Sequence, residues 1–163
     1  MNTAIPLGST EFDIILQHTL RGSRYAQRLL DSDPELLPWL RMGYATPCTA
    51  AEMATWLGLL SVADEASLSR TLRILRKRVL LKLLTRDLGG LADLGEVMAC
   101  MTALAEITIQ QAQAFVMQAL VAQHGQPLNA QGVPQEMLVL GMGKLGGREL
   151  NVSSDIDLIF IYP

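Results

Sequence analysis

Hydrophobic positions along most of this chain repeat with the period of an α-helix. Over residues 64–87 they recur at steps of three and four, which predicts one long helix with a single apolar stripe. The stripe consists of Leu68, Leu72, Leu75, Val79 and Leu83. A second long helix is expected over residues 93–123, and Gly89-Gly90 is expected to end the first, because glycine readily takes the left-handed conformation that follows a helix. Two long helices joined by so short a turn should pack antiparallel.

Shorter helices are expected before residue 64. They cover residues 10–20, 24–30, 50–60 and a segment that starts at Asp33-Pro34-Glu35. Thr10 (or Ser9) and Thr49 can cap their helices by accepting a first-turn amide hydrogen bond. Asp33 is also expected to cap its helix, because a proline and an acid follow it in the first turn.

The pattern changes after residue 123. Residues 124–136 hold prolines and glycines and are typical of a connector, and short strands are expected over residues 137–140 and 156–162. The expected fold class is therefore mainly α, with an amino-terminal helical bundle over residues 1–130. Residues 131–163 are expected to contain the first strands of a mixed α/β domain. Because the chain stops after the second strand, we expect this domain to be incomplete.

Composition narrows the possible functions. The net charge of −3 argues against a non-specific nucleic-acid binder, which needs a broad cationic surface. No stretch is long and apolar enough for a membrane helix, and the first residues do not resemble a signal peptide. Cys48 and Cys100 cannot form a disulfide framework, so a reducing cytoplasm is the expected location.

Candidate chemistry lies between residues 141 and 157. The residues are a glycine cluster with a lysine (Gly141, Gly143, Lys144, Gly146, Gly147), a serine pair (Ser153, Ser154) and an aspartate pair (Asp155, Asp157). Clustered glycines let backbone amides approach a phosphate closely, the lysine adds a positive charge, and the hydroxyls can bond to phosphate. A plain tight turn is the alternative explanation of the glycines.

The aspartates stand two positions apart at the start of the second expected strand, so their side chains should share one face. Residues 158–161 are apolar on both faces, which predicts a buried strand. Like charges at the entrance of a buried strand repel each other unless a cation lies between them. Asp155 and Asp157 are therefore predicted to bind one divalent metal ion.

Two other features have more than one interpretation. Residues 141–146 satisfy the dinucleotide-binding pattern G-x-G-x-x-G, but that pattern should open a full helix followed by a parallel strand and an acid, which are missing here. The basic residues of the first long helix are Arg70, Arg73, Arg76, Lys77 and Arg78. They are interpreted as its solvated face, with the alternative that some reach a nucleotide or an acidic partner.

Residues 141–162, GMGKLGGRELNVSSDIDLIFIY, resemble the signature of the glutamine synthetase adenylyltransferase family, within the nucleotidyltransferase superfamily. The likeness extends to LRILRKR at residues 72–78 and to residues 126–132 and 137–140. The form NVSS at residues 151–154 resembles the amino-terminal, adenylyl-removing copy of the duplicated catalytic domain.

This resemblance implies that Asp155 and Asp157 bind Mg²⁺ and that the glycine cluster with Ser153 and Ser154 holds nucleotide phosphates. The implied substrates are ATP or ADP and inorganic phosphate, and the implied partners are glutamine synthetase and the PII signalling protein. The family's third metal carboxylate comes from a later strand, so the resemblance also implies that these 163 residues alone are inactive. A non-catalytic helical interaction module remains the alternative.

Overall fold

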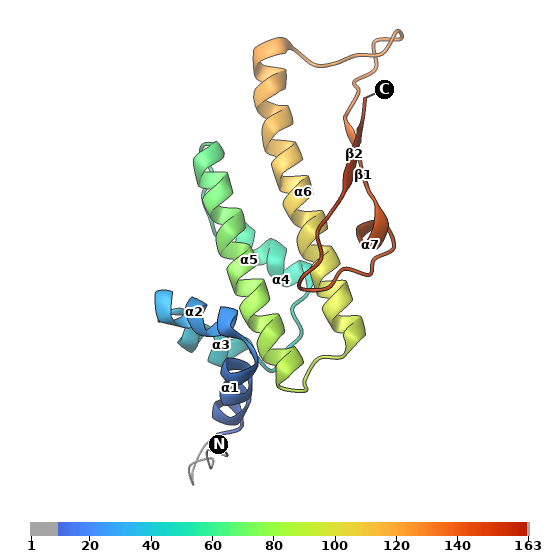
Figure 1. The fold of residues 1–163 in the computed structure, drawn as a ribbon. Helices are drawn as coiled ribbons and strands as arrows, with labels where there is room; N and C mark the ends of the chain where they lie inside the picture. The colour runs from blue at the N-terminus through green and yellow to red at the C-terminus, as the bar shows by residue number, and fades with distance from the viewer. Residues whose placement is uncertain (1–9, 163) are drawn as a thin grey trace.

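The protein is mainly helical, as expected, in a computed structural model that describes residues 10–162 (Figure 1). The helices are α1 (Glu11–Gly22), α2 (Arg24–Ser32), α3 (Leu36–Gly43), α4 (Ala50–Gly58), α5 (Glu65–Leu88), α6 (Leu94–His124) and α7 (Gly143–Gly146). The strands are β1 (Leu138–Gly141) and β2 (Leu158–Ile161). No helix among the described residues is long and apolar enough to cross a membrane.

Local capping explains where most helices begin. The Thr10 hydroxyl accepts a hydrogen bond from the Asp13 amide at 3.3 Å, and the Asp13 carboxylate accepts one from the Thr10 amide at 3.1 Å. The Thr10 hydroxyl also donates to the Asp13 carboxylate at 2.7 Å, and this bond, together with the one from the Thr10 amide, holds the pKa of Asp13 below its usual value. Thr49 caps α4 as predicted, by accepting from the Glu52 amide at 3.2 Å.

The predicted helix start at Asp33 is wrong. Asp33 is the carboxyl-terminal cap of α2, where its amide donates to the Leu29 carbonyl at 3.0 Å. Its carbonyl accepts from the Leu36 amide at 3.1 Å, and α3 begins at Leu36 without a side-chain cap. The chain therefore makes a turn at Pro34-Glu35 before the helix begins.

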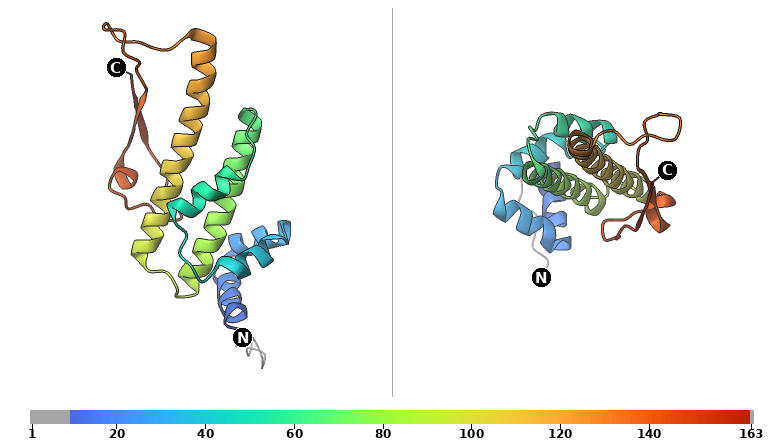
Figure 2. Two further views of the ribbon diagram at one scale, coloured as in Figure 1. Left: turned by 180° about the vertical axis from the view of Figure 1, so that it is seen from behind. Right: turned by 90° about the horizontal axis from the view of Figure 1, so that it is seen from above.

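Helices α5 and α6 form the antiparallel pair that the sequence predicts, joined through Gly90, whose φ is 74°. They lie together near this turn and diverge toward their other ends (Figures 1 and 2). Helix α4 contacts both, while α1, α2 and α3 pack on α5. Two core clusters result, one among α4, α5 and α6 and the other between α5 and the first three helices.

Helix α5 also buries two basic side chains. The Lys82 ammonium donates to both Glu52 carboxylate oxygens, at 2.8 and 2.9 Å, and its side chain is 1% exposed. The Arg86 guanidinium binds Glu96 at the start of α6, at 2.5 and 2.9 Å. These ion pairs attach α4 and α6 to the carboxyl-terminal part of α5.

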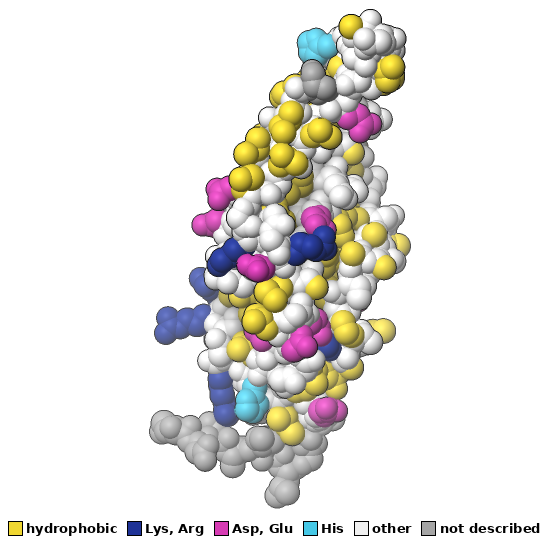
Figure 3. Space-filling view, turned by 90° about the vertical axis from the view of Figure 1, so that its right-hand side faces the viewer, with side chains coloured by type: hydrophobic (Ala, Val, Ile, Leu, Met, Phe, Trp, Pro, Cys, Tyr) yellow, Lys and Arg dark blue, Asp and Glu magenta, His cyan; other side chains and the backbone are white. Residues whose placement is uncertain are grey.

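Strands β1 and β2 pair antiparallel, with Leu140 opposite Ile159 and Leu138 opposite Ile161. Residues directly opposite each other share a face, so these four side chains lie on one face, and each is 39–57% exposed. Figure 3 shows hydrophobic side chains gathered on the side of the molecule that carries the strands. The prediction that residues 158–161 are buried is wrong for the described residues.

Candidate functional site

Gly141 of the glycine cluster ends β1, and Gly147 is the carboxyl-terminal cap of a short helix, α7, that contains Gly143 and Gly146. Gly143 begins it with φ 53°, a conformation that favours glycine. A Cβ on Gly141 would lie 2.6 Å from the Leu145 side chain, and one on Gly146 would lie 2.6 Å from the Gly141 carbonyl oxygen. Conformation and close packing thus explain these three glycines, and phosphate binding at Gly141, Gly143, Gly146, Gly147 and the exposed Lys144 stays a prediction.

Two leucines anchor this segment to the helices. Leu145 in α7 is 7% exposed and Leu150 is 2% exposed, and both belong to the cluster formed by α4, α5 and α6. The exposed ion pair between Arg148 and Glu106 of α6, at 3.1 Å, adds a polar contact. The segment that carries the candidate residues is therefore fixed against α6.

Asn151 organises the serine pair. Its side-chain oxygen accepts hydrogen bonds from the hydroxyls of Ser153 and Ser154, both at 3.0 Å, and from the Ser153 amide at 3.1 Å. The Ser154 hydroxyl in turn accepts from the Asn151 amide at 3.1 Å. The hydroxyls therefore shape the turn that leads to Asp155, a role that the sequence did not reveal although Asn-x-Ser-Ser is typical of such turns. Their binding of phosphate stays a prediction.

The aspartates lie in the segment that leads into β2, not within a strand as predicted. The Met142 amide donates to the Asp157 carbonyl at 2.9 Å, which fixes Asp157 beside the first turn of α7. Asp155 lines a hollow between this segment, α5 and α6. Both aspartates are exposed, and among the described residues no side chain pairs with either carboxylate. The structure thus places Asp157 beside α7 and Asp155 beside the long helices α5 and α6.

The hollow at Asp155 has a volume of about 260 Å³. Its floor is apolar and comes from α6 and the chain before β2, including Leu104, Ile109 and Leu150. Arg76 of α5 and Ser154 also line it. We call this hollow the Asp155 cleft.

The carboxylates suit a hard divalent cation. Within residues 10–162 no three His, Cys, Asp or Glu side chains gather as a metal site. Magnesium, however, is usually held by one or two carboxylates, with water and substrate phosphates as its other ligands. Asp155 and Asp157, whose carboxylates have no partner among residues 10–162, fit such a site.

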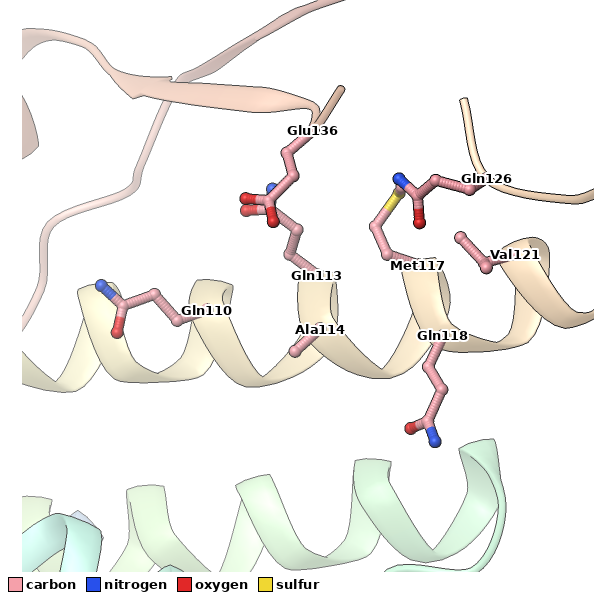
Figure 4. A pocket seen from close by; sticks show the side chains of 8 residues that line it. All are labelled: Gln110, Gln113, Ala114, Met117, Gln118, Val121, Gln126 and Glu136. Atoms are coloured by element: carbon pink, nitrogen blue, oxygen red, sulfur yellow. The ribbon is translucent and has the colours of Figure 1, made fainter. Parts of the chain in front are cut away.

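A separate hollow of about 480 Å³ lies between the second half of α6 and the connector. Figure 4 shows Gln113 of α6 and Glu136 of the connector pointing toward one another in it. The Gln113 side-chain amide also donates to the Met137 carbonyl and so ties α6 to the chain that enters β1. Neither aspartate lines this hollow, so we do not assign the candidate chemistry to it.

The basic stripe of α5 is largely solvated, as interpreted from the sequence. Arg70, Arg73, Arg76 and Lys77 are exposed, whereas Arg78 is half-buried with its guanidinium 5.7 Å from the centre of the Trp39 ring. The antiparallel pairing of β1 and β2 and the brevity of α7 also exclude a dinucleotide-binding βαβ unit in this segment.

Comparison with known proteins gives the family. Residues 15–163 match the family model described as glutamate-ammonia ligase adenylyltransferase. Three relatives carry the name bifunctional glutamine synthetase adenylyltransferase/adenylyl-removing enzyme. They come from Aromatoleum aromaticum (50% identical over 148 residues, 91% of this chain), Nitrosomonas eutropha (47% over 163 residues, 97%) and Bordetella pertussis (48% over 150 residues, 88%).

The chain spans 16–18% of the length of these relatives. The match covers both the helical segment and the strands, so it does not depend on the aspartate motif alone. The resemblance seen in the sequence is thus confirmed, and the chain belongs to the glutamine synthetase (glutamate-ammonia ligase) adenylyltransferase family.

Proposed function

We propose that residues 141–157 form one side of a Mg²⁺-dependent site that moves an adenylyl group to or from glutamine synthetase. The observation that supports it best is the placement of Asp155 and Asp157. The Asp155 carboxylate lines a cleft against α5 and α6, Asp157 accepts a backbone hydrogen bond from Met142 at the start of α7, and neither carboxylate has a partner among the described residues. Relatives that match this segment are named for adding and removing the same group.

In this proposal Asp155 and Asp157 hold the cation. A bound Mg²⁺ neutralises charge on the phosphoryl group being transferred and activates the attacking oxygen. The chain's own contribution is positioning: the Asn151 turn fixes the approach to Asp155, and the Met142 amide fixes the backbone of Asp157. Lys144 and the α7 glycines bind nucleotide phosphates in the same proposal.

The substrates follow from adenylyl chemistry. For removal, inorganic phosphate attacks the phosphorus of the AMP–tyrosine linkage on glutamine synthetase, the tyrosine oxygen leaves, and ADP is released. For addition, the tyrosine oxygen attacks the α-phosphorus of ATP, and pyrophosphate leaves. We further propose a cytoplasmic location and regulation by the PII signalling protein, because the family acts on a nitrogen-assimilation enzyme.

Asp155 and Asp157 are the two acidic ligands that the described residues supply in this proposal, whereas the family resemblance implies a third carboxylate from a later strand. We therefore expect nucleotide binding but no measurable adenylyl transfer or removal by this polypeptide alone.

The test uses a longer polypeptide of this family that contains the same segment. Phosphate-dependent release of AMP groups from adenylylated glutamine synthetase is measured with and without Mg²⁺. Asp155→Asn and Asp157→Asn should each abolish activity while leaving the fold intact, because both carboxylates are exposed. Asp87→Asn, an exposed aspartate on α5 far along the chain from this segment, is the matched control. Full activity in Asp155→Asn would refute the proposal.

A further inference from the structure

The Asp155 cleft brings opposite charges together without pairing them. Arg76 reaches it from α5, and Asp155 reaches it from the segment before β2, which is 79 positions later in the numbering (155 − 76). Arg76 and Asp155 do not form an ion pair with each other, and no other described residue pairs with Arg76. An arginine and an aspartate that face one cleft and remain apart leave space for a ligand that carries both signs of charge.

We infer that Arg76 is a phosphate-binding residue that acts across the cleft from Asp155. The inference rests on the proposed function, since it takes Asp155 as a Mg²⁺ ligand. A phosphoryl group that shares a cation with Asp155 presents its remaining oxygens to the other wall of the cleft. The planar guanidinium of Arg76 binds two such oxygens at once, which a lysine in its place does not.

The rest of the basic stripe is arranged differently. Arg78 lies against the Trp39 ring, and Arg70 and Lys77 are exposed and do not line the cleft. Arg73 is one turn before Arg76, exposed, and does not line the cleft. Arg76 is therefore singled out by its position and not by charge alone.

The lining of the cleft strengthens such a contact. Its floor includes Met101, Leu104 and Leu150, each buried in the core of α4, α5 and α6. This apolar floor lowers the local dielectric constant on one side of the exposed Arg76 and Asp155 side chains, so a charge pair formed over it is stronger than one surrounded by water. The volume of about 260 Å³ accommodates a phosphoryl group together with part of a nucleotide.

The experiment titrates the 163-residue chain with ADP and, separately, with inorganic phosphate, each with and without Mg²⁺, by calorimetry. Arg76→Gln is compared with the matched control Arg73→Gln, which removes the same charge one helical turn away. Arg76→Gln should weaken Mg²⁺-dependent binding by about tenfold to a hundredfold, as expected for losing charged hydrogen bonds to phosphate. Arg73→Gln should stay within about twofold of the unmodified chain. Unchanged circular dichroism shows that both variants fold.

The outcomes separate the two proposals. An Arg76-dependent effect with inorganic phosphate assigns the contact to that substrate, and an effect with ADP alone assigns it to the nucleotide phosphates; either supports the inference. The inference is overturned if Arg76→Gln and Arg73→Gln weaken the binding equally. If Asp155→Asn still abolishes Mg²⁺-dependent binding in that case, the proposed function stands. Binding indifferent to Mg²⁺ and to Asp155→Asn overturns the proposed function. No binding of either ligand at millimolar concentration overturns the inference, and the transfer assay then decides the proposed function.

Discussion

Replacing Arg86 with lysine keeps a positive charge but removes a set of contacts that depend on the shape of the guanidinium. Beyond its two bonds to Glu96, Arg86 donates to the Tyr44 carbonyl at 2.9 Å and to the Leu91 carbonyl at 3.1 Å. Its side chain is 4% exposed and that of Glu96 is 18% exposed. The hydrogen bond with Glu96 raises the pKa of Arg86, so the group stays charged throughout the working pH range.

The expected loss follows from the contacts. A lysine ammonium has no planar fork, so it reaches the Glu96 carboxylate or the carbonyls but not all of them. Leaving two half-buried carbonyls without donors costs about 1–2 kcal/mol each, which gives about 2–4 kcal/mol for Arg86→Lys. Arg86→Met also leaves the Glu96 charge unpaired and should cost about 3–5 kcal/mol.

Urea unfolding followed by circular dichroism measures these losses. The matched control is Arg41→Lys, because Arg41 pairs with Asp13 at 2.8 Å but is 52% exposed, and such pairs contribute less than about 1 kcal/mol. The melting temperature should fall by about 5–15 °C for Arg86→Lys, given about 2–4 °C per kcal/mol at this size. If Arg86→Lys costs no more than Arg41→Lys, water reaches the carbonyls, and the assignment of Arg86 as a buried junction is incorrect.

Four further outcomes are expected. Hydrogen bonds from Ser67 lower the pKa of Asp64 in the folded chain. The ionised carboxylate therefore contributes stability above the unfolded pKa of 3.8, and this contribution is lost as the pH falls below that value. Asp64→Asn should remove this part of the loss of stability in acid, as measured by urea unfolding. A hydrogen bond with Cys48 and burial raise the pKa of Cys100, so its folded form retains a proton that the unfolded chain releases, and stability should fall as the pH rises above 9.0. Both thiols are buried and should react with a thiol reagent only on unfolding; fast reaction of the native chain would contradict this. Leu140→Thr combined with Ile159→Thr should reduce self-association in light scattering with little change in unfolding, whereas unchanged association would mean that other surfaces cause it.

Helix starts were predictable wherever the cap is local. Thr10 and Thr49 each bond to an amide three residues ahead, so neighbouring sequence alone reveals them. The predicted helix start at Asp33 was wrong because the same pattern also suits the end of a helix followed by a turn. Asp33 is instead the carboxyl-terminal cap of α2. The long helices α5 and α6 were predicted almost to their ends because a regular apolar stripe and paired glycines are strong signals.

Features that depend on distant partners were not predictable. Lys82 sits in the apolar run of α5 and is neutralised by Glu52, which lies 30 residues earlier. A charge inside such a run was the available signal, but nothing local identifies its partner. Similarly, an apolar strand such as β2 indicates burial, yet its exposed fraction depends on what covers the sheet. At the candidate site the aspartates were visible in sequence, whereas the role of Asn151 required the folded turn.

Leu145 and Leu150 tie the two halves of the molecule into a shared interior with Leu75 and Leu83 of α5. The hydrophobic core of the helical bundle is therefore incomplete without the later segment that carries Leu145 and Leu150. Cutting away residues 137–163 would remove both leucines, at a cost of about 2–5 kcal/mol for each large side chain lost. A shortened bundle that fails to bind a partner would therefore reflect a collapsed interior as readily as a missing contact, and point substitutions on the strands are the cleaner way to separate docking from catalysis.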